Sequence, residues 1–284
     1  MIAKMSELLA ECAKKRCAVA AFNFSTLEYG RAAIEAAEET GLPFILQHAP
    51  AHEKYVPLDM AAPIMLQLAK EAKVPVAVHL DHGTDFALCR HALELGFTSV
   101  MIDSSSLTFG ENAAVAAEVV KEARRRGADV EAELGSMPHN FNGELGEYSP
   151  EDFYTRPEEA AKYLELTGVD ALAISFGTVH GVYKAKPTLA LDVIERVSAA
   201  TGGLPLVMHG GSGLSDDDFR NAISKGIRKI NYYTYGALAG GRAVRALAEE
   251  KGEALQIHDV AVAAAKAIRE DLVNVMKLFS MEDR

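Results

Sequence analysis

The chain has 284 residues, 49% of them hydrophobic, and its 29 basic and 40 acidic residues give a formal net charge of −11. This charge argues against non-specific binding to nucleic acid or to an anionic membrane. No segment approaches the roughly 18 uninterrupted apolar residues of a membrane span, and charge interrupts the N-terminal segment before a signal-peptide core could form. Cys12, Cys17 and Cys89 show neither disulfide-type nor metal-type spacing, so we expect a reduced, soluble, cytoplasmic protein.

Short apolar runs alternate with amphipathic stretches along the whole chain. We expect β-strands at Cys17–Phe22, Pro43–Gln47, Pro75–Leu80, Ser99–Ile102, Asp129–Leu134, Ala171–Ser175, Leu204–Met208 and Ile227–Asn231. We expect α-helices at Thr26–Glu39, Asp59–Ala72, Asp85–Leu95, Glu111–Arg126, Pro157–Thr167, Leu189–Ala200, Asp216–Ser224 and Tyr235–Lys251. This alternation predicts an α/β fold, the TIM (β/α)8 barrel, with additional helices at Ser6–Lys15 and Asp259–Phe279.

An open doubly wound sheet uses the same alternation, but no G-x-G-x-x-G turn follows the first strand, which favours the barrel. No linker divides the chain, so residues 1–284 are expected to form one domain. Glycines end several helices, as a left-handed helix stop requires: Gly41, Gly96, Gly127, Gly168 and Gly226. The segment Gly135–Asp152 is too long for an ordinary connection and is typical of a lid or binding loop.

Polar residues follow the predicted strands at their carboxyl ends, which is the face where TIM barrels carry their active sites. These residues are Asn23, Gln47, Asp81 with His82, Asp103, Glu133, His180, His209 and Asn231. Because every strand supplies one, we expect a site at this face that ligates or hydrogen-bonds a small molecule.

Three of these residues are histidines from distant strands, His82, His180 and His209. Three histidines with an open position are typical of catalytic zinc, which polarises a carbonyl as a Lewis acid. The alternative is that each is an ordinary strand-end histidine with its own hydrogen bonds. Asp81 is placed to transfer protons; its alternative role is to cap the next helix, for which Asp85 is the better candidate.

Glycine-rich and helix-opening turns follow the last two strands, Gly210-Gly211-Ser212-Gly213 and Asn231-Tyr232-Tyr233-Thr234. Backbone N–H groups at such turns hold phosphate, and TIM barrels often place a phosphate site there. The alternative for Gly210–Gly213 is a plain tight turn. We expect a phosphate site, which supplies the local attraction for an anion that an acidic protein needs.

Taken together, several segments resemble the class II, metal-dependent ketose-bisphosphate aldolases, the family of fructose- and tagatose-bisphosphate aldolases. The resemblance runs over nearly the whole chain, and His79-Leu-Asp-His-Gly83 and Gly177-Thr-Val-His-Gly181 are its most specific parts. The other matching segments are Ala21–Asn23, Ser99–Asp103, Val130–Gly135, His209–Gly213 and Lys229–Asn231.

The resemblance implies reversible cleavage of a phosphorylated ketose to dihydroxyacetone phosphate and an aldehyde through a metal-stabilised enediolate. It implies that His82, His180 and His209 bind the catalytic Zn2+ and that Asp81 is the proton donor and acceptor. The resemblance also implies that Asp103 and Glu133 hold a second or displaced metal, and that Asn231 contacts the reacting carbons. It implies a phosphate site, associated with a monovalent cation, at Gly181, Lys184, Gly211, Ser212 and Thr234. No strand ends in a lysine, which disfavours a Schiff-base mechanism.

Three departures from the family pattern surround this core. Glu144 is the candidate for the loop glutamate that assists proton transfer in the family. Gln47 with His48 stands where a small hydroxyl residue is usual, and Tyr233 stands in the phosphate turn. We expect His48 and Tyr233 to crowd the pocket or add hydrogen bonds to it, and the substrate to be non-standard or to lack a second phosphate.

Two other readings stay open at this point: a zinc-dependent barrel hydrolase, and a metal-binding member of the family without activity. The hydrolase would not need the phosphate turns, and loss of a ligand or of Asp81 would mark the inactive member. The apolar C-terminal helix and the family likeness favour a homodimer or homotetramer.

Overall fold

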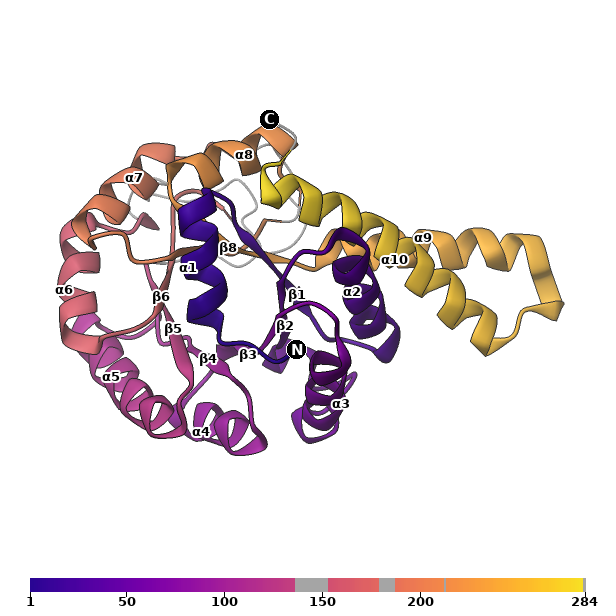
Figure 1. Cartoon of the computed structure of the whole chain (residues 1–284), viewed down its shortest axis with the longest axis horizontal. Coiled ribbons are helices and arrows are strands. Elements are labelled where there is room, and N and C mark those ends of the chain that lie inside the picture. Colours follow the sequence, from indigo (N-terminus) through magenta and orange to yellow (C-terminus); the bar gives the residue numbers. More distant parts are fainter. Residues whose placement is uncertain (136–152, 179–186, 212, 283–284) are drawn as a thin grey trace.

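The computed structural model describes residues 1–135, 153–178, 187–211 and 213–282. Eight parallel strands close into one barrel in chain order (Figure 1). They are β1 (Val19–Asn23), β2 (Phe44–His48), β3 (Val76–Gly83), β4 (Ser99–Ile102), β5 (Asp129–Leu134), β6 (Ala171–Ile174), β7 (Leu206–Met208) and β8 (Ile227–Tyr232). The predicted TIM barrel is confirmed.

Helices follow the strands and surround the barrel (Figure 1). They are α1 (Met5–Lys15), α2 (Leu27–Thr40), α3 (Leu58–Glu71), α4 (Phe86–Leu95), α5 (Phe109–Arg126), α6 (Pro157–Thr167), α7 (Leu191–Ala200), α8 (Asp216–Lys225), α9 (Thr234–Lys251) and α10 (Ile257–Ser280), with short 3-10 turns η1 (Pro50–His52) and η3 (Gly252–Ala254). The expected glycine stops have positive φ, and Asp85 caps α4 by accepting a hydrogen bond from the Leu88 N–H at 2.9 Å. Asp81 is therefore not the cap of that helix.

Helix α1 closes the N-terminal end of the barrel. Its Met5, Leu8 and Leu9 side chains pack against the inward-facing small residues of the strands, such as Ala21 and Ala77. The backbone N–H of Ser6 also donates to the Asp129 carboxylate at 2.8 Å. Because this end is filled, the opposite end, where the strands finish, is the one that can admit a ligand.

Strand β3 contains a β-bulge at its carboxyl end. Leu80 pairs with Val100, but Gly83 pairs with Ile102, so β3 has one residue more than β4 over this interval. His82 lies inside the bulge with a φ of 49°, a left-handed conformation that is uncommon outside glycine. The strand thus runs to Gly83 instead of ending at the predicted Leu80.

Gly83 allows β3 and β4 to lie this close together. A Cβ atom at this position would be 2.5 Å from the Met101 carbonyl oxygen and 2.7 Å from the Cys89 sulfur. Neither atom is free to move far, because one is strand backbone and the other is buried. The bulge therefore depends on glycine at its last position.

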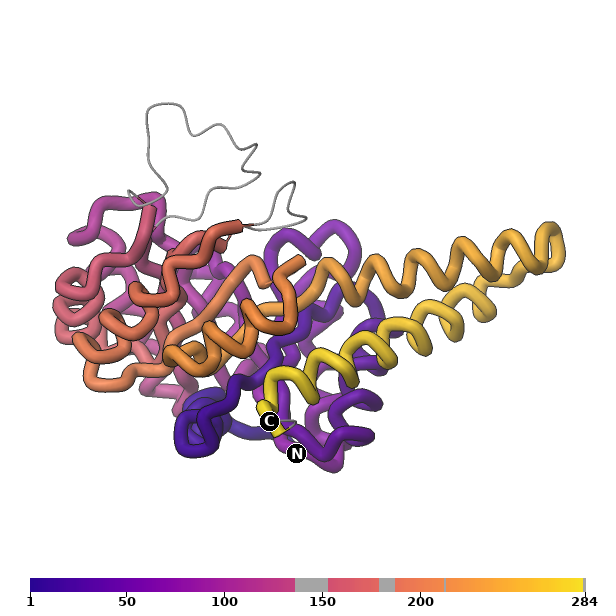
Figure 2. Tube along the Cα trace, turned by 90° about the horizontal axis from the view of Figure 1, so that it is seen from above, coloured from indigo at the N-terminus to yellow at the C-terminus, as the bar shows by residue number. Residues whose placement is uncertain are grey.

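The C-terminal helices form a hairpin that projects from the barrel (Figures 1 and 2). The C-terminal part of α10 is held in the fold by the buried Leu272, Met276 and Phe279. In the projecting part, Ile257 is 83% exposed and Val262 is 69% exposed. Among the helices of the described residues, none combines the length and the apolar character that crossing a membrane demands.

Candidate active site

A cavity of about 300 Å³ opens at the carboxyl end of the barrel. It is lined by Asn23, Ala49, Ala51, His52, Asp81, His82, Gly210, Gly211, Asn231, Tyr233 and Thr234. The fold thus brings together eight of the residues predicted for the site. Glu144, His180, Gly181, Lys184 and Ser212 lie outside the described residues.

Asp81 is the buried carboxylate at the floor of this cavity, with 3% of its surface exposed. The Asn23 side-chain amide donates to one carboxylate oxygen at 3.0 Å, and the Asn231 amide donates to the other at 2.8 Å. Burial alone would raise the pKa of Asp81, but the positive potential of His82 and Lys229 holds it well below its usual range. Asp81 is thus an ionised base with a fixed orientation.

His82 reaches the same cavity although it directly follows Asp81 in the strand. Regular alternation would send adjacent side chains to opposite faces, and the bulge with its left-handed His82 interrupts that alternation. Its Nδ1 lies 2.7 Å from the Asp103 carboxylate, and its ring centre is 4.6 Å from that of His209. Burial opposes the charged form, but Asp81 and the hydrogen bond to Asp103 raise the pKa of His82.

His209 is fully buried at the end of β7 between two glutamates. Its Nε2 lies 2.9 Å from a Glu131 carboxylate oxygen, and its Nδ1 lies 3.5 Å from Glu133. Burial would lower the pKa of His209, but the hydrogen bonds to Glu131 and Glu133 raise it to about 10. Each of the two histidines thus has one ring nitrogen oriented by a carboxylate, which is how metal-binding imidazoles are usually held.

These residues can hold a divalent metal ion. Asp81, His82 and His209 form one group of close donor atoms, and His82, Asp103 and Glu133 form a second, with all atoms of a group within 4.8 Å of one another. Imidazole and carboxylate donors at this spacing suit zinc and related ions. His82 belongs to both groups.

A buried ionic network lies beneath the cavity and was not predicted from the sequence. The Lys229 ammonium is 2.8 Å from Glu131, and both side chains are fully buried. His79 points into the barrel as well, with Nδ1 2.9 Å from the Ser99 hydroxyl and Nε2 3.6 Å from Glu131. A signal was present: Glu131, Lys229 and His79 stand two positions before predicted site residues, and strand residues two apart face the same way.

Two turns that we expected to bind phosphate form one side of the cavity. Gly210 and Gly211 follow β7, and Thr234 opens α9. A Cβ at Gly211 would lie 3.1 Å from the Phe219 ring and 3.3 Å from the Asn231 carbonyl, so the turn packs closely against its surroundings. Backbone N–H groups at such a turn and at a helix start are suited to an anion.

At the end of β2, the residues that line the cavity differ from those we expected. Gln47 is fully buried and donates to the Asn23 side-chain oxygen at 3.1 Å, so it holds Asn23 and does not line the cavity. His48 turns away to the Val56 carbonyl at 2.9 Å, which corrects the expectation that it crowds the pocket. His52 lines the cavity instead, with its ring centre 4.7 Å from that of Tyr233.

His52 is a neutral polar group in the cavity wall. Burial, with a smaller contribution from His48, lowers its pKa to about 4. Its Nδ1 is buried without a hydrogen-bond partner among the described residues, and 6% of the side chain remains exposed. The sequence showed His52 only as one of several histidines after β2, because its position depends on the turn η1.

Comparisons with known proteins agree with this geometry. The family pattern described as "Fructose-bisphosphate aldolase class-II" matches residues 3–284. The "Probable fructose-bisphosphate aldolase" of Bacillus subtilis (strain 168) is 37% identical over 286 residues, covering 100% of this chain and 99% of that protein. The "Fructose-bisphosphate aldolase" of Staphylococcus aureus (strain N315) is 36% identical over 288 residues, with the same coverage.

A solved structure has the same fold. The crystal structure of the YdjI aldolase from Escherichia coli K12 matches with a TM-score of 0.86 and 33% identity, covering 98% of this chain and 97% of that one. The predicted resemblance is confirmed at the level of sequence and of fold. The chain belongs to the class II fructose-bisphosphate aldolase family, whose members are metal-dependent lyases that act on phosphorylated sugars.

Proposed function

We propose that this protein catalyses the zinc-dependent, reversible aldol cleavage of a phosphorylated ketose to dihydroxyacetone phosphate and an aldehyde, with Asp81 as proton acceptor and donor. The observation that carries the proposal is the placement of Asp81. Its two oxygens are fixed by Asn23 and Asn231, and it lies beside His82 and His209 at the floor of a closed-ended barrel.

In the cleavage direction, Asp81 accepts the proton of the sugar hydroxyl adjacent to the carbon–carbon bond that breaks. In the condensation direction it returns this proton to the aldehyde oxygen. Its low pKa keeps it ionised, and the two amides keep it aimed at the reacting atoms. We assign Asn231 to the triose carbons on the family resemblance, and its position in the cavity lining supports this role.

His82 and His209, with His180 from outside the described residues, would hold the zinc ion. When bound, zinc supplies Lewis-acid stabilisation of negative charge on the substrate oxygens. Asp103 and Glu131 orient the imidazoles, while Asp103 and Glu133 offer the donors of a second position. A Schiff-base role for Lys229 is disfavoured, because its ammonium is already paired with Glu131 below the cavity.

The phosphate of the dihydroxyacetone half would lie at Gly210, Gly211 and Thr234. Their position between the end of β7 and the start of α9 supports this assignment. We assign Gly181, Lys184 and Ser212 to the same phosphate on the family resemblance, together with a bound monovalent cation.

The other half of the substrate is proposed to carry no phosphate. The described residues around the cavity include neither lysine nor arginine, and the side formed by Ala49, Ala51 and His52 is small or neutral. A second phosphate would meet the Asp81 carboxylate without a lysine or arginine among the described lining residues to offset the repulsion. A hydroxylated aldehyde, in contrast, could hydrogen-bond the His52 imidazole and the Tyr233 hydroxyl.

A retro-aldol assay on matched pairs of ketose 1-phosphate and ketose 1,6-bisphosphate tests both the aldolase activity and the absence of a second phosphate from the substrate. Release of dihydroxyacetone phosphate is followed for each member of a pair. We expect a higher kcat/KM for the 1-phosphates. Activity confined to fructose 1,6-bisphosphate would overturn the substrate assignment, and no release from any member would overturn the aldolase assignment.

We also propose that the protein is a homodimer or homotetramer joined through the projecting α9–α10 hairpin. The exposure of Ile257 and Val262 supports this, because large apolar side chains on a protruding element are typical of an interface. Light scattering on the wild type and on the Ile257→Glu, Val262→Glu variant tests it. We expect the variant to have a smaller mass in solution; a monomeric wild type would contradict the proposal.

A further inference from the structure

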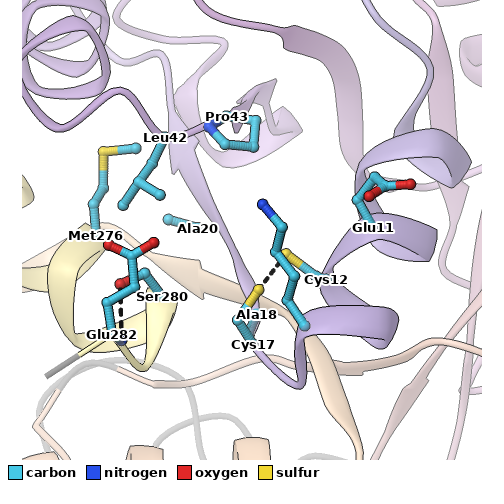
Figure 3. A pocket seen from close by; sticks show the side chains of 11 residues that line it. Glu11, Cys12, Cys17, Ala18, Ala20, Leu42, Pro43, Met276, Ser280 and Glu282 are labelled. Atoms are coloured by element: carbon cyan, nitrogen blue, oxygen red, sulfur yellow. Dashed lines mark hydrogen bonds between the residues drawn. The ribbon is translucent and has the colours of Figure 1, made fainter. Parts of the chain in front are cut away.

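The sulfur atoms of Cys12 and Cys17 lie 2.9 Å apart at the N-terminal end of the barrel (Figure 3). Cys12 is in the last turn of α1, and Cys17 precedes β1. Arg16 adopts a left-handed φ of 55° between them, and the Cys17 N–H donates to the Cys12 carbonyl at 3.0 Å. The turn that ends the helix thus brings the two thiols face to face, although their sequence spacing gave no sign of it.

The two thiols are not equivalent. The hydrogen bond with Cys12 holds the pKa of Cys17 below that of an ordinary thiol, with further help from the positive charges of Lys15 and Arg228. The same hydrogen bond raises the pKa of Cys12. Because the thiolate is the reactive form, the lowered pKa favours Cys17 as the attacking sulfur of the pair.

Both cysteines line a cavity of about 60 Å³ between α1, β1 and the end of α10, with Leu42 and Met276 on its wall (Figure 3). The pair is buried, with Cys12 7% and Cys17 6% exposed, and this small space is the opening beside it. The third cysteine provides a contrast. Cys89 is 1% exposed, its sulfur lies 3.5 Å from the Met101 carbonyl, and burial raises its pKa to about 12.

We propose that Cys12 and Cys17 are a redox-active dithiol, which a low-molecular-weight disulfide such as oxidised glutathione converts reversibly to an intramolecular disulfide. The Cys17 thiolate attacks one sulfur of the oxidant, forming a mixed disulfide and releasing one thiolate. The Cys12 sulfur then attacks Cys17, loses its proton and releases the second thiolate. The protein loses two hydrogen atoms overall, and the oxidant is reduced to two thiols.

The new bond would join α1 to the residue two positions before β1. Since α1 closes the barrel end and β1 carries Asn23, oxidation would fix the closing helix to a strand of the active site. This modification site is independent of the proposed aldol chemistry, because it lies at the opposite end of the barrel.

The experiment uses the full-length, metal-loaded protein in glutathione buffers of increasing disulfide content, followed by acid quenching, alkylation and tryptic mapping without reduction. Trypsin cuts within the Lys14-Lys15-Arg16 segment, so the disulfide would join two separate peptides, 5–14 and 17–31. We expect this joined product to appear with oxidant and to disappear with dithiothreitol. Cys89, in peptide 74–90, should remain alkylated throughout and serves as the internal control.

Single variants identify the order of attack. In Cys12→Ser, glutathione should accumulate on Cys17, because the resolving sulfur is missing. In Cys17→Ser, Cys12 should gain at least about tenfold less glutathione under the same conditions. Equal labelling of the two variants, or preferential labelling of Cys12, would overturn the assignment. Absence of the joined peptide in the wild type would overturn the proposal even if neither variant folds.

Discussion

The Nε2 of His209 lies 2.9 Å from Glu131, and Nδ1 of the same ring lies 3.5 Å from Glu133. Glu131 in turn contacts Lys229 at 2.8 Å. The orientation of His209, a candidate metal ligand, is thus set by residues that do not line the cavity themselves.

Replacing Glu131 with Gln should weaken zinc binding by about 10- to 100-fold, because the amide is a poorer acceptor for the His209 N–H. Competition with a chromogenic chelator measures the affinity directly, without an activity assay. Glu118→Gln, on the exposed face of α5, is the matched control. Unchanged affinity in Glu131→Gln would show that His209 is oriented by other contacts.

Lys229→Met should lower the free energy of unfolding by about 3–5 kcal/mol, because the buried Glu131 carboxylate loses its lysine partner and keeps only its contacts with histidines. The double variant Lys229→Met, Glu131→Gln should recover much of this loss, since the buried Glu131 charge that lost its lysine is removed as well. Urea denaturation of the single and double variants measures both values. A double variant less stable than Lys229→Met would contradict the charge-pair explanation.

Asp81→Asn should reduce turnover by about 10²- to 10⁴-fold while zinc content persists. The fold can accept asparagine here, because the Asn231 amide can rotate to present its oxygen, which has no hydrogen-bond partner among the described residues. Steady-state kinetics and metal analysis are made on the same sample. Near-normal turnover with a full complement of zinc would remove Asp81 from the proton-transfer step.

Gly83→Ala should destabilise the protein by more than about 2 kcal/mol, since its Cβ would overlap the Met101 carbonyl. Gly110→Ala in α5 is the control, because a Cβ there meets nothing within 4 Å. Thermal unfolding compares the two variants. Equal midpoints would mean that the bulge accommodates a larger residue without strain.

His52 predicts a pH-dependent stability. Its pKa is lowered to about 4 in the fold and is about 6.5 in an unfolded chain. Between about pH 6.5 and pH 4, His52 is protonated in the unfolded chain but remains neutral in the native protein. The native state is therefore destabilised relative to the unfolded state as the pH falls through this range. At neutral pH the titration of His52 hardly changes the free energy of unfolding. At pH 4.5 it lowers the free energy of unfolding by about 2 kcal/mol.

His52→Gln removes this titration. The stability of the wild type relative to the variant should therefore decline on acidification, as urea unfolding at pH 7 and pH 4.5 would measure. His258→Gln, at an exposed position, is the control. Parallel pH profiles for the wild type and His52→Gln would contradict the buried, neutral state of His52.

Much of this protein was predictable because periodicity and position in a barrel are properties of the sequence. Asp81, His209 and Asn231 follow apolar runs, and strands that alternate with helices bring such ends together. The helix cap at the exposed Asp85 was equally predictable, since capping involves only residues that are close in sequence.

Features that depend on tertiary contacts were not predictable in this way. The turn η1 decides that His52 and not His48 lines the cavity, and helix termination brings Cys12 to Cys17. Glu131 and Lys229 were visible as charges within apolar strands. Their pairing depends on the register between β5 and β8 across the barrel interior, which no single strand encodes.

The bulge in β3 bears on any attempt to move this chemistry to another barrel. In a host barrel with a regular third strand, only one of two consecutive side chains would point inward. Copying the Asp81-His82 pair alone would therefore bring only one of the two side chains into the site. The inserted residue, the left-handed backbone of His82 and the following Gly83 must be transferred as a unit. Conversely, deleting Leu80 would keep Asp81 and His82 in the chain but restore regular alternation, so that the two side chains would no longer face the same cavity.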